Sequence, residues 1–408
     1  MSALIPINGI FGMSFTRGIY WLKMNKLVKN IIKMGLYIHS IVKLRNKAEP
    51  QFPDSPKRIL LVKTHAIGDT IMITPSIKAL RNKYPNAHIG LLTGLSSMRI
   101  IQGNTDIDEL LAFDETALFA PKPIEIIKLI HRVRMKKFDM AFIFQYSSLI
   151  HLLVKAFGIP FRIGFDKDGS GFSLTRSVPW DITDKRWTGD VFLDIASLAG
   201  AEITDKRLRI NISGDDIKFA DAFLKSNSVT DKNILVGIFP GGGKNTRDTV
   251  YQKRWGVEKY AAIIDMLSAN YDAKIIAFGS SDEEKLISRL IKLSHAEIIN
   301  ACGKTNLKQL AALIKKCSLL IANDSAPLHI AIAMDTPTVS LFGPSRAKTI
   351  IEENEKHIAI QSAYPCSPCY CNSVFPGCEN PECMEAISID AVIFAVEKQL
   401  GKLCLIKG

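Results

Sequence analysis

The sequence has no uncharged hydrophobic run that is long enough to span a membrane. Its longest such runs, residues 1–16 and 140–154, fall short of the roughly 20 residues that a transmembrane helix needs. The first run also lacks the basic segment and the small-residue cleavage site of a secretory signal. We therefore expect the protein to stay in the cytoplasm.

Acidic residues are absent from residues 1–48, which contain eight Lys or Arg. The net charge of the 408-residue chain is +12, so the remainder carries only +4, and we expect no nucleic-acid partner. Wound as a helix, residues 17–47 place apolar side chains on one side and lysines on the other. This pattern is typical of helices that lie on an anionic membrane surface; a helix packed on the protein itself or on a partner is the alternative. The proline-rich residues 49–56 indicate a stiff linker.

Histidine is absent from the cysteine-rich stretch 366–383, where five of the eight cysteines lie. In a reducing compartment cysteines are more often thiols or metal ligands than disulfides. The spacing of Cys366, Cys369, Cys378 and Cys383 is similar to that of structural zinc sites, so these four are candidate ligands of a structural zinc. Free thiols or a disulfide are the alternatives, and we do not connect the cluster with catalysis.

A complete P-loop is also lacking. The run Cys302-Gly303-Lys304-Thr305 ends like a Walker A motif, but residue 298 is isoleucine where that motif needs glycine. A P-loop nucleotide triphosphatase is therefore excluded.

The stretch 58–92 predicts one βαβ unit. Residues 59–62 are apolar, as in a buried parallel strand; a tight loop follows, and from Asp69 the apolar residues recur with the helical period. The loop opens at the carboxyl end of a strand, where open α/β sheets bind ligands, and Gly68 allows the backbone to turn there. Asp69 falls at the helix N-terminus, where the helix dipole favours its ionised form. A purely helix-capping role for Asp69 is the alternative.

Strands and helices alternate in two series, which predicts two parallel sheets with helices on both faces. Within residues 57–212 the expected strands are 59–62, 89–92, 110–113, 140–144 and 162–165, with helices at 123–136 and 148–157. Within residues 234–408 they are 234–239, 274–278, 297–299, 319–321 and 338–342. Residues 213–233 contain one polar-rich helical pattern and indicate the connection between two domains, which residues 1–56 precede.

Two polar side chains in the first series, Gln145 and Arg162, sit at the ends of predicted strands, a position suited to ligand contact. A basic cluster on the expected helix 123–136 suits an anionic ligand, but a solvated helix face is the commoner reading of such a cluster. It comprises Arg132, Arg134, Lys136 and Lys137.

Three consecutive glycines, Gly241, Gly242 and Gly243, follow the strand 234–239. Backbone without side chains approaches phosphate oxygens closely and offers them N–H groups, although a plain loop is the alternative. Lys253, a cation, lies just before the next helix. The run 323–329, with Asp324, joins a buried strand to a helical pattern.

Three segments together resemble glycosyltransferase family 9, the lipopolysaccharide heptosyltransferases. They are LLVKTHAIGDTIMITPSIKALRNKYPNAHIGLLT, FPGGGKNTRDTVYQKRWGVEKYAAII and LLIANDSAPLHIAIAMDTPTVSLFGPS. The resemblance implies an α/β fold of GT-B architecture, with two Rossmann-like domains facing a cleft behind the basic amphipathic N-terminal helix. It implies that the N-terminal domain binds the acceptor and the C-terminal domain the nucleotide sugar. A last helix, about residues 388–400, would return to the first domain.

The resemblance also implies roles for individual residues. Asp69 and Lys253 would be catalytic, Asp69 as the base that takes the acceptor's proton and Lys253 on the phosphates. The residues implied for donor binding are Gly241, Gly242, Gly243, Lys253, Glu283, Glu284, Asp324, Ser325, Ala326 and His329. Those expected for acceptor binding are Thr64, His65, Gly68, Gln145 and Arg162. The chain departs from the family pattern at Ala326, where glycine is usual, and in a longer loop at residues 244–252; a core histidine is the alternative for His329.

The implied reaction is an inverting transfer of a heptose from ADP-heptose to a lipid-linked saccharide of the lipopolysaccharide core type. It would take place on the inner face of the cytoplasmic membrane, with no cofactor required for catalysis. A transferase or epimerase that uses another nucleotide sugar is the first alternative. A non-catalytic sugar-binding scaffold is the second, although such a scaffold would need neither Asp69 nor Lys253.

Overall fold

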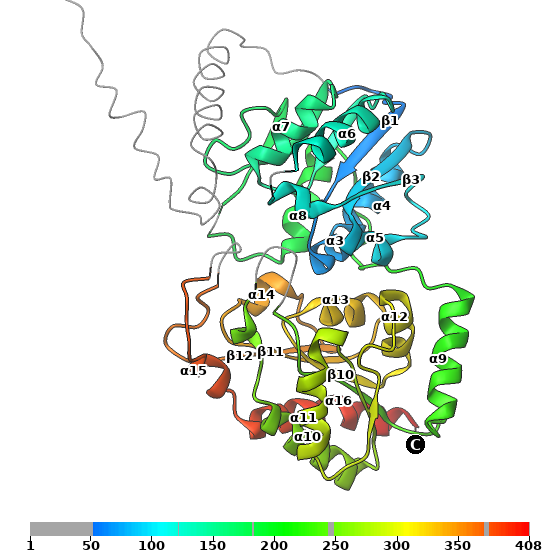
Figure 1. Ribbon diagram of the computed structural model, residues 1–408, viewed down its shortest axis with the longest axis vertical. Coiled ribbons are helices and arrows are strands. Elements are labelled where there is room, and N and C mark those ends of the chain that lie inside the picture. The colour runs from blue at the N-terminus through cyan, green and yellow to red at the C-terminus, as the bar shows by residue number, and fades with distance from the viewer. Residues whose placement is uncertain (1–51, 121, 182, 244–248, 371–374, 408) are drawn as a thin grey trace, which may run out of the picture.

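The computed structural model describes residues 52–120, 122–181, 183–243, 249–370 and 375–407. The predicted amphipathic helix and the first part of its linker lie outside the described residues, so their structure is not discussed. Two α/β domains are stacked along the long axis of the molecule, as Figure 1 shows.

The N-terminal domain is built on a six-stranded sheet in the order β3-β2-β1-β4-β5-β6, with all neighbouring strands parallel. Its strands are nearly continuous apolar runs because both faces of a parallel sheet are buried. The sequence pattern missed only the last one, at the sheet edge. The strands are β1 Arg58–Val62, β2 His88–Gly94, β3 Glu109–Phe113, β4 Met140–Ile143, β5 Phe161–Asp166 and β6 Arg176–Pro179.

Helices cover both faces of this sheet. Alternate residues of β1 point to opposite faces, so Ile59 and Leu61 belong to one apolar cluster and Leu60 and Val62 to another. The first cluster includes residues of α3 Ile67–Met72, α4 Thr74–Lys83, α5 Leu95–Ile101 and α8 Thr188–Leu198. The second includes residues of α6 Pro123–Arg134 and α7 Ser148–Ala156. The short turn η2, Glu115–Leu118, precedes α6.

The C-terminal domain repeats the plan with a parallel sheet in the order β12-β11-β10-β7-β8-β9. Its strands are β7 Leu235–Phe239, β8 Lys274–Ala277, β9 Ile298–Asn300, β10 Leu319–Asn323, β11 Thr338–Phe342 and the edge strand β12 His357–Gln361, which the sequence pattern missed. Its helices are α10 Val257–Tyr271, α11 Glu284–Leu293, α12 Leu307–Lys316, α13 Ala326–Ala333, α14 Ala347–Ile350, α15 Glu382–Glu385 and α16 Ile389–Lys407, with the turns η3 Tyr251–Lys253 and η4 Ser281–Glu283.

The two domains pack directly against each other. Helix α3 contacts α13, and α9 (Gly214–Ser226), which lies in the connection between the domains, contacts α12. One apolar cluster therefore includes residues of both sheets. Two hydrogen bonds also join the domains. The indole nitrogen of Trp187 donates to the backbone carbonyl of Ile350 at 3.2 Å, and the hydroxyl of Thr188 donates to the backbone carbonyl of Thr349 at 2.6 Å.

The last helix does not return to the first domain, so that expectation is wrong. Helix α16 packs on α10, β11 and β12, all in the C-terminal domain. Its buried residues Val392, Val396 and Leu400 belong to the core of that domain. In Figure 1 the helix lies at the end of the molecule opposite the N-terminal domain.

Candidate active site

The loop after β1 brings Asp69 to the domain interface. Asp69 lies in the first turn of α3, but the residue that caps this helix is Ala66, at φ 72°, and no side chain caps it. The carboxylate of Asp69 instead accepts a hydrogen bond from Nζ of Lys63 at 2.7 Å. A purely capping role is therefore wrong for Asp69.

Lys63 is a residue that the sequence reasoning missed. Its side chain is only 5% exposed, and its Nζ lies 5.3 Å from the centre of the Phe192 ring. A buried ammonium requires a counter-charge, which Asp69 supplies. The pairing uses Oδ2 of Asp69, no hydrogen bond reaches Oδ1 from the described residues, and the side chain remains 38% exposed. Oδ1 is thus available to accept a proton.

Three of the predicted acceptor residues form one polar cluster beside this loop. The hydroxyl of Thr64 donates to Oε1 of Gln145 at 2.7 Å, and the backbone N–H of Thr64 donates to the same atom at 3.2 Å. Nδ1 of His65 lies 3.0 Å from both the Thr64 hydroxyl and Nε2 of Gln145. The carboxyl ends of β1 and β4 are adjacent in the sheet, which is why residues 80 positions apart meet here.

Arg162 does not join this cluster. It is the second residue of β5, so it lies near the amino end of the strand, away from the edge that carries Asp69. Its guanidinium donates to the backbone carbonyls of Ser173, Ile159 and Pro160 at 2.6–2.9 Å. Burial lowers the pKa of Arg162. We therefore assign it a structural role and not an acceptor contact.

Gly68 allows α3 to approach the C-terminal domain. A β-carbon at this position would lie 2.5 Å from Cδ2 of His329, well inside van der Waals contact. His329 lies on α13, only 5% exposed, and its Nδ1 has no hydrogen-bond partner in the described structure. Burial lowers the pKa of His329, which favours the neutral ring.

Lys253 and Asp324 form a buried ion pair in the C-terminal domain. Nζ of Lys253 donates to Oδ2 of Asp324 at 2.7 Å, and the two side chains are 14% and 8% exposed. Nζ also lies 4.3 Å from the centre of the Tyr370 ring. Burial works against the charge of Lys253, but Asp324 and Tyr370 outweigh it, so the pKa of Lys253 is raised. Burial also works against the charge of Asp324, and Lys253 outweighs it, so the pKa of Asp324 is lowered.

The charges of the two domains act on one another. Asp69, in the N-terminal domain, contributes to raising the pKa of Lys253 and opposes the lowering of the pKa of His329. The interface therefore has a carboxylate on one side and a paired ammonium on the other. This is the arrangement that a transfer between an acceptor and an anionic leaving group requires.

The glycine triplet is held by its own domain. Oε1 of Glu283 accepts a hydrogen bond from the backbone N–H of Gly242 at 2.7 Å and lies 3.0 Å from Nη2 of Arg254. Nε of Arg254 in turn donates to the carbonyl of Gly242 at 2.9 Å. Gly242 and Gly243 have φ angles of 97° and 83°, which favour glycine, and a β-carbon at Gly241 would lie 2.0 Å from Oε1 of Glu283.

Asn323 is a second residue that the sequence reasoning missed. At the buried end of β10, its Nδ2 donates to the carbonyls of Pro240 and Gly241 at 2.9 and 3.1 Å. Its Oδ1 accepts from the backbone N–H of Trp255 at 3.2 Å and from the hydroxyl of Tyr260 at 3.0 Å. This one amide therefore fixes the glycine loop and the segment after Lys253 relative to each other. Its position directly before Asp324 was the available signal.

Of the remaining predicted donor residues, Ser325 and Ala326 lie at the start of α13, and Glu284 lies at the start of α11. Ser325 precedes α13 and makes no side-chain cap. The second helical residue, Pro327, has no N–H, and the N–H of Leu328 donates to the carbonyl of Ser325 at 3.2 Å. Ala326 is the first helical residue, a position where alanine causes no backbone strain. Glu284, in contrast, is an exposed residue at the start of α11, whereas the neighbouring Glu283 is buried.

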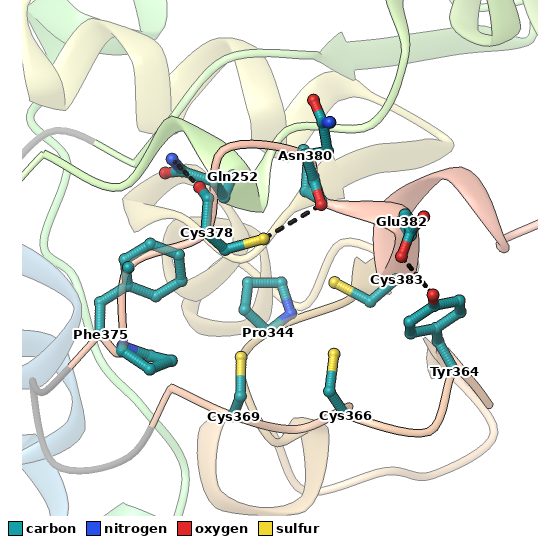
Figure 2. Close-up of a pocket in the computed structure, with 13 residues that line it drawn as sticks. Gln252, Pro344, Tyr364, Cys366, Cys369, Phe375, Cys378, Asn380, Glu382 and Cys383 are labelled. Carbon is teal, nitrogen blue, oxygen red and sulfur yellow. Dashed lines mark hydrogen bonds between the residues drawn. The ribbon is translucent and has the colours of Figure 1, made fainter.

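The four candidate zinc ligands surround one pocket of about 240 Å³. Figure 2 shows the sulfur atoms of Cys366, Cys369, Cys378 and Cys383 pointing into it. Burial and the other three thiols raise the pKa of Cys383. Among the described residues no three His, Cys, Asp or Glu side chains are close enough together to hold a metal ion. The pocket adjoins the donor side of the interface, because Nε2 of Gln252 donates to the carbonyl of Cys378 at 2.7 Å.

Comparisons with known proteins agree with this geometry. A curated relative, the lipopolysaccharide core heptosyltransferase OpsX of Haemophilus influenzae, is 26% identical over 301 residues, which is 72% of this chain and 81% of that protein. The crystal structure of a family 9 glycosyltransferase from Veillonella parvula has 25% identity and a TM-score of 0.74, covering 87% of this chain and 100% of that one. The E. coli ADP-heptose lipopolysaccharide heptosyltransferase II, at 20% identity, gives 0.67 with 85% and 99% coverage, so it supports the fold alone.

The family model described as glycosyltransferase family 9 (heptosyltransferase) matches residues 126–374, more than half of the chain. The two-domain α/β fold and the presence of both halves of the site agree with that match. The chain belongs to glycosyltransferase family 9 and is a glycosyltransferase.

Proposed function

We propose that the protein transfers a heptose from ADP-heptose to a lipid-linked saccharide of the lipopolysaccharide core, with inversion at the anomeric carbon. The observation that carries the proposal is the placement of Asp69 and the Lys253–Asp324 pair on opposite sides of one domain interface. The name of the curated relative OpsX supplies the heptose and the acceptor class, and ADP as the carrier of the heptose is what the resemblance to family 9 implies.

In this reaction an acceptor hydroxyl loses its proton to Oδ1 of Asp69, and its oxygen bonds to the anomeric carbon. The attack comes from the face opposite the diphosphate. The bond from the anomeric carbon to the diphosphate breaks, and ADP leaves with the bonding electrons. Lys63 keeps the carboxylate of Asp69 oriented through Oδ2.

The leaving diphosphate gains charge, and the C-terminal domain supplies the groups that stabilise it. Lys253 provides an ammonium, and the N-terminus of α13 provides the positive end of a helix dipole. Asp324 keeps Lys253 in position. Because these groups supply positive charge at the phosphates, we propose that catalysis requires no divalent ion.

The proposed function is tested by comparing how well different nucleotide sugars and nucleoside diphosphates bind the protein. ADP-heptose and ADP should protect the purified protein against thermal unfolding more strongly than UDP-sugars and UDP. Transfer of radiolabelled heptose to a heptose-acceptor core lipid should continue in excess EDTA. A preference for another nucleotide sugar would favour a different transferase on the same fold.

The acceptor is lipid-linked, so we place the enzyme on the inner face of the cytoplasmic membrane, held by the basic segment 17–47. None of the described helices is long and apolar enough to cross a membrane. A chain shortened to begin at Gln51 would keep the packing of Phe52 on Phe161, whose ring centres are 5.1 Å apart. The shortened chain should stay folded and lose part of its binding to anionic vesicles. The difference in binding between the shortened and the full-length chain should be larger at low salt.

We also propose that the cysteine pocket holds one structural zinc. Its support is the convergence of four thiols on one pocket, the ligand type that zinc prefers in structural sites. Binding would require the thiolates to move closer together. Elemental analysis of protein purified under reducing conditions decides the matter, and a metal content far below one per chain would leave the cluster as free thiols.

A further inference from the structure

Helix α6 is apolar on two opposite faces. Leu129 and Val133, on its inner face, are buried in the core of the N-terminal domain. On the outer face Ile124 and Ile127 are 65% and 64% exposed, and Met135, at the end of the helix, is 64% exposed. Soluble helices usually present polar residues on the outer face, so a second apolar stripe indicates a surface that meets something else.

The spacing of the exposed residues makes this one surface, which we call the outer face of α6. Positions 127 and 128 lie three and four residues after 124, position 131 lies four and three residues after them, and position 135 follows four residues later, so all five lie on the same side of the helix. Phe119, just before the helix, is 40% exposed, and its ring centre lies 5.6 Å from that of His65. The outer face therefore begins next to the loop that carries Asp69.

Positive charge is concentrated around this face. Residues 122–137 contain six Lys or Arg and one Glu, a net charge of +5. Residues 49–408 carry only +4 in total, so the rest of that range is close to neutral. Lys122, Lys128 and Lys136 have carboxylate partners. The exposed cations Arg132, Arg134 and Lys137 have none within the described ranges of the chain.

We propose that the outer face of α6 binds an anionic lipid bilayer directly. Apolar side chains flanked by cations suit the boundary of a bilayer, where the former enter the acyl region and the latter meet lipid phosphates. The basic segment 17–47 is an unsuitable occupant because both partners are positively charged. The inference rests on the proposed function in one respect: a lipid-linked acceptor would reach His65 and Asp69 from the membrane that α6 contacts.

The test is sedimentation of the full-length protein with vesicles of phosphatidylcholine and phosphatidylglycerol in a 7:3 ratio. The variant Ile124→Ser/Ile127→Ser should lower the partition coefficient roughly tenfold, because both exposed side chains lose apolar area that would enter the bilayer. The matched control is Ile217→Ser/Leu293→Ser, which removes two side chains, each 38% exposed, from helices α9 and α11 of the C-terminal domain. It should bind as the unchanged protein does.

The charge contribution is tested by Arg134→Ser/Lys137→Asn. This variant should bind the mixed vesicles more weakly and should not differ on phosphatidylcholine alone, and its deficit should disappear at high salt. Every variant should stay folded, and its ADP binding by calorimetry should be unchanged. Failure of the unchanged protein to bind ADP would count against the proposed function and not against the lipid surface.

Two results would overturn the inference. The first is equal vesicle binding by the α6 apolar variant and its control, which would assign attachment to other parts of the chain. The second is a change from dimer to monomer in size-exclusion chromatography without any loss of vesicle binding, which would identify a second copy of the chain as the occupant.

Discussion

Gly68 and His329 meet across the two domains so closely that a β-carbon on Gly68 would lie 2.5 Å from Cδ2 of the imidazole. Gly68 lies in helix α3, where alanine would have no backbone strain, so glycine is required here for space. The loop that carries Asp69 and helix α13 are therefore packed with no room for a methyl group between them.

Gly68→Ala should weaken the contact between the domains. We expect a loss of about 1–3 kcal/mol in the free energy of unfolding, as for other overpacked sites, together with slower transfer. The control is Gly214→Ala, because Gly214 begins α9 and nothing lies within 4 Å of its added β-carbon. Chemical denaturation of both variants provides the measurement. If Gly68→Ala and Gly214→Ala had equal free energies of unfolding, the interface would have to rearrange around the added methyl group at little cost.

Asp69→Asn should reduce transfer by roughly 10²–10⁴-fold, because the amide cannot accept the acceptor's proton. The amide oxygen can still accept the hydrogen bond from Lys63, so ADP affinity should change little. Turnover and calorimetry together test this. Near-complete retention of activity would remove Asp69 as the base.

Lys253→Ala should weaken ADP binding and destabilise the protein by about 3–5 kcal/mol, since it leaves the buried carboxylate of Asp324 without a partner. The double variant Lys253→Ala/Asp324→Asn should recover much of the stability without recovering ADP affinity. Recovery of both properties would show that Lys253 serves the fold and not the phosphates.

The stability of the protein should fall in mild acid. Burial lowers the pKa of His357 to about 4 from an ordinary value near 6.5. Above pH 6.5 this histidine is neutral in both states; between 6.5 and about 4 the unfolded chain binds a proton that the folded chain excludes. The free energy of unfolding should therefore fall by up to about 1.4 kcal/mol per pH unit from this group.

His357→Gln should remove part of that pH dependence. Urea denaturation at pH 7.5 and pH 5.0 is the measurement. An identical slope with and without His357 would assign the acid sensitivity to other groups.

The sequence predicted the central strands and the loops at their carboxyl ends because apolar runs and helical periods are local signals. It missed β6 and β12 because edge strands such as Arg176–Pro179 are only partly buried and lack a continuous apolar pattern. The return of the last helix to the first domain rested on the resemblance, and the contacts of α16 with α10, β11 and β12 contradict it.

Sequence motifs identified most of the predicted site residues. They did not identify the buried side chains that hold those residues in place. Lys63 and Asn323 are buried polar groups whose partners include residues distant in sequence: Phe192 for Lys63, and Pro240 and Trp255 for Asn323. Arg162 appeared suitable because it stood beside a predicted strand, but its position at the amino end of β5 directs it to backbone carbonyls. Such contacts require the tertiary structure.

Because α16 stays with the C-terminal domain, each domain is a continuous stretch of the described chain, joined by a single crossing around α9. The exposed turn at Thr230 and Asp231 follows α9 and precedes β7. Two polypeptides divided between these residues would each contain a whole sheet, and the apolar cluster shared by the domains would give them a reason to reassociate. The N-terminal and C-terminal halves could thus be produced, exchanged and labelled separately.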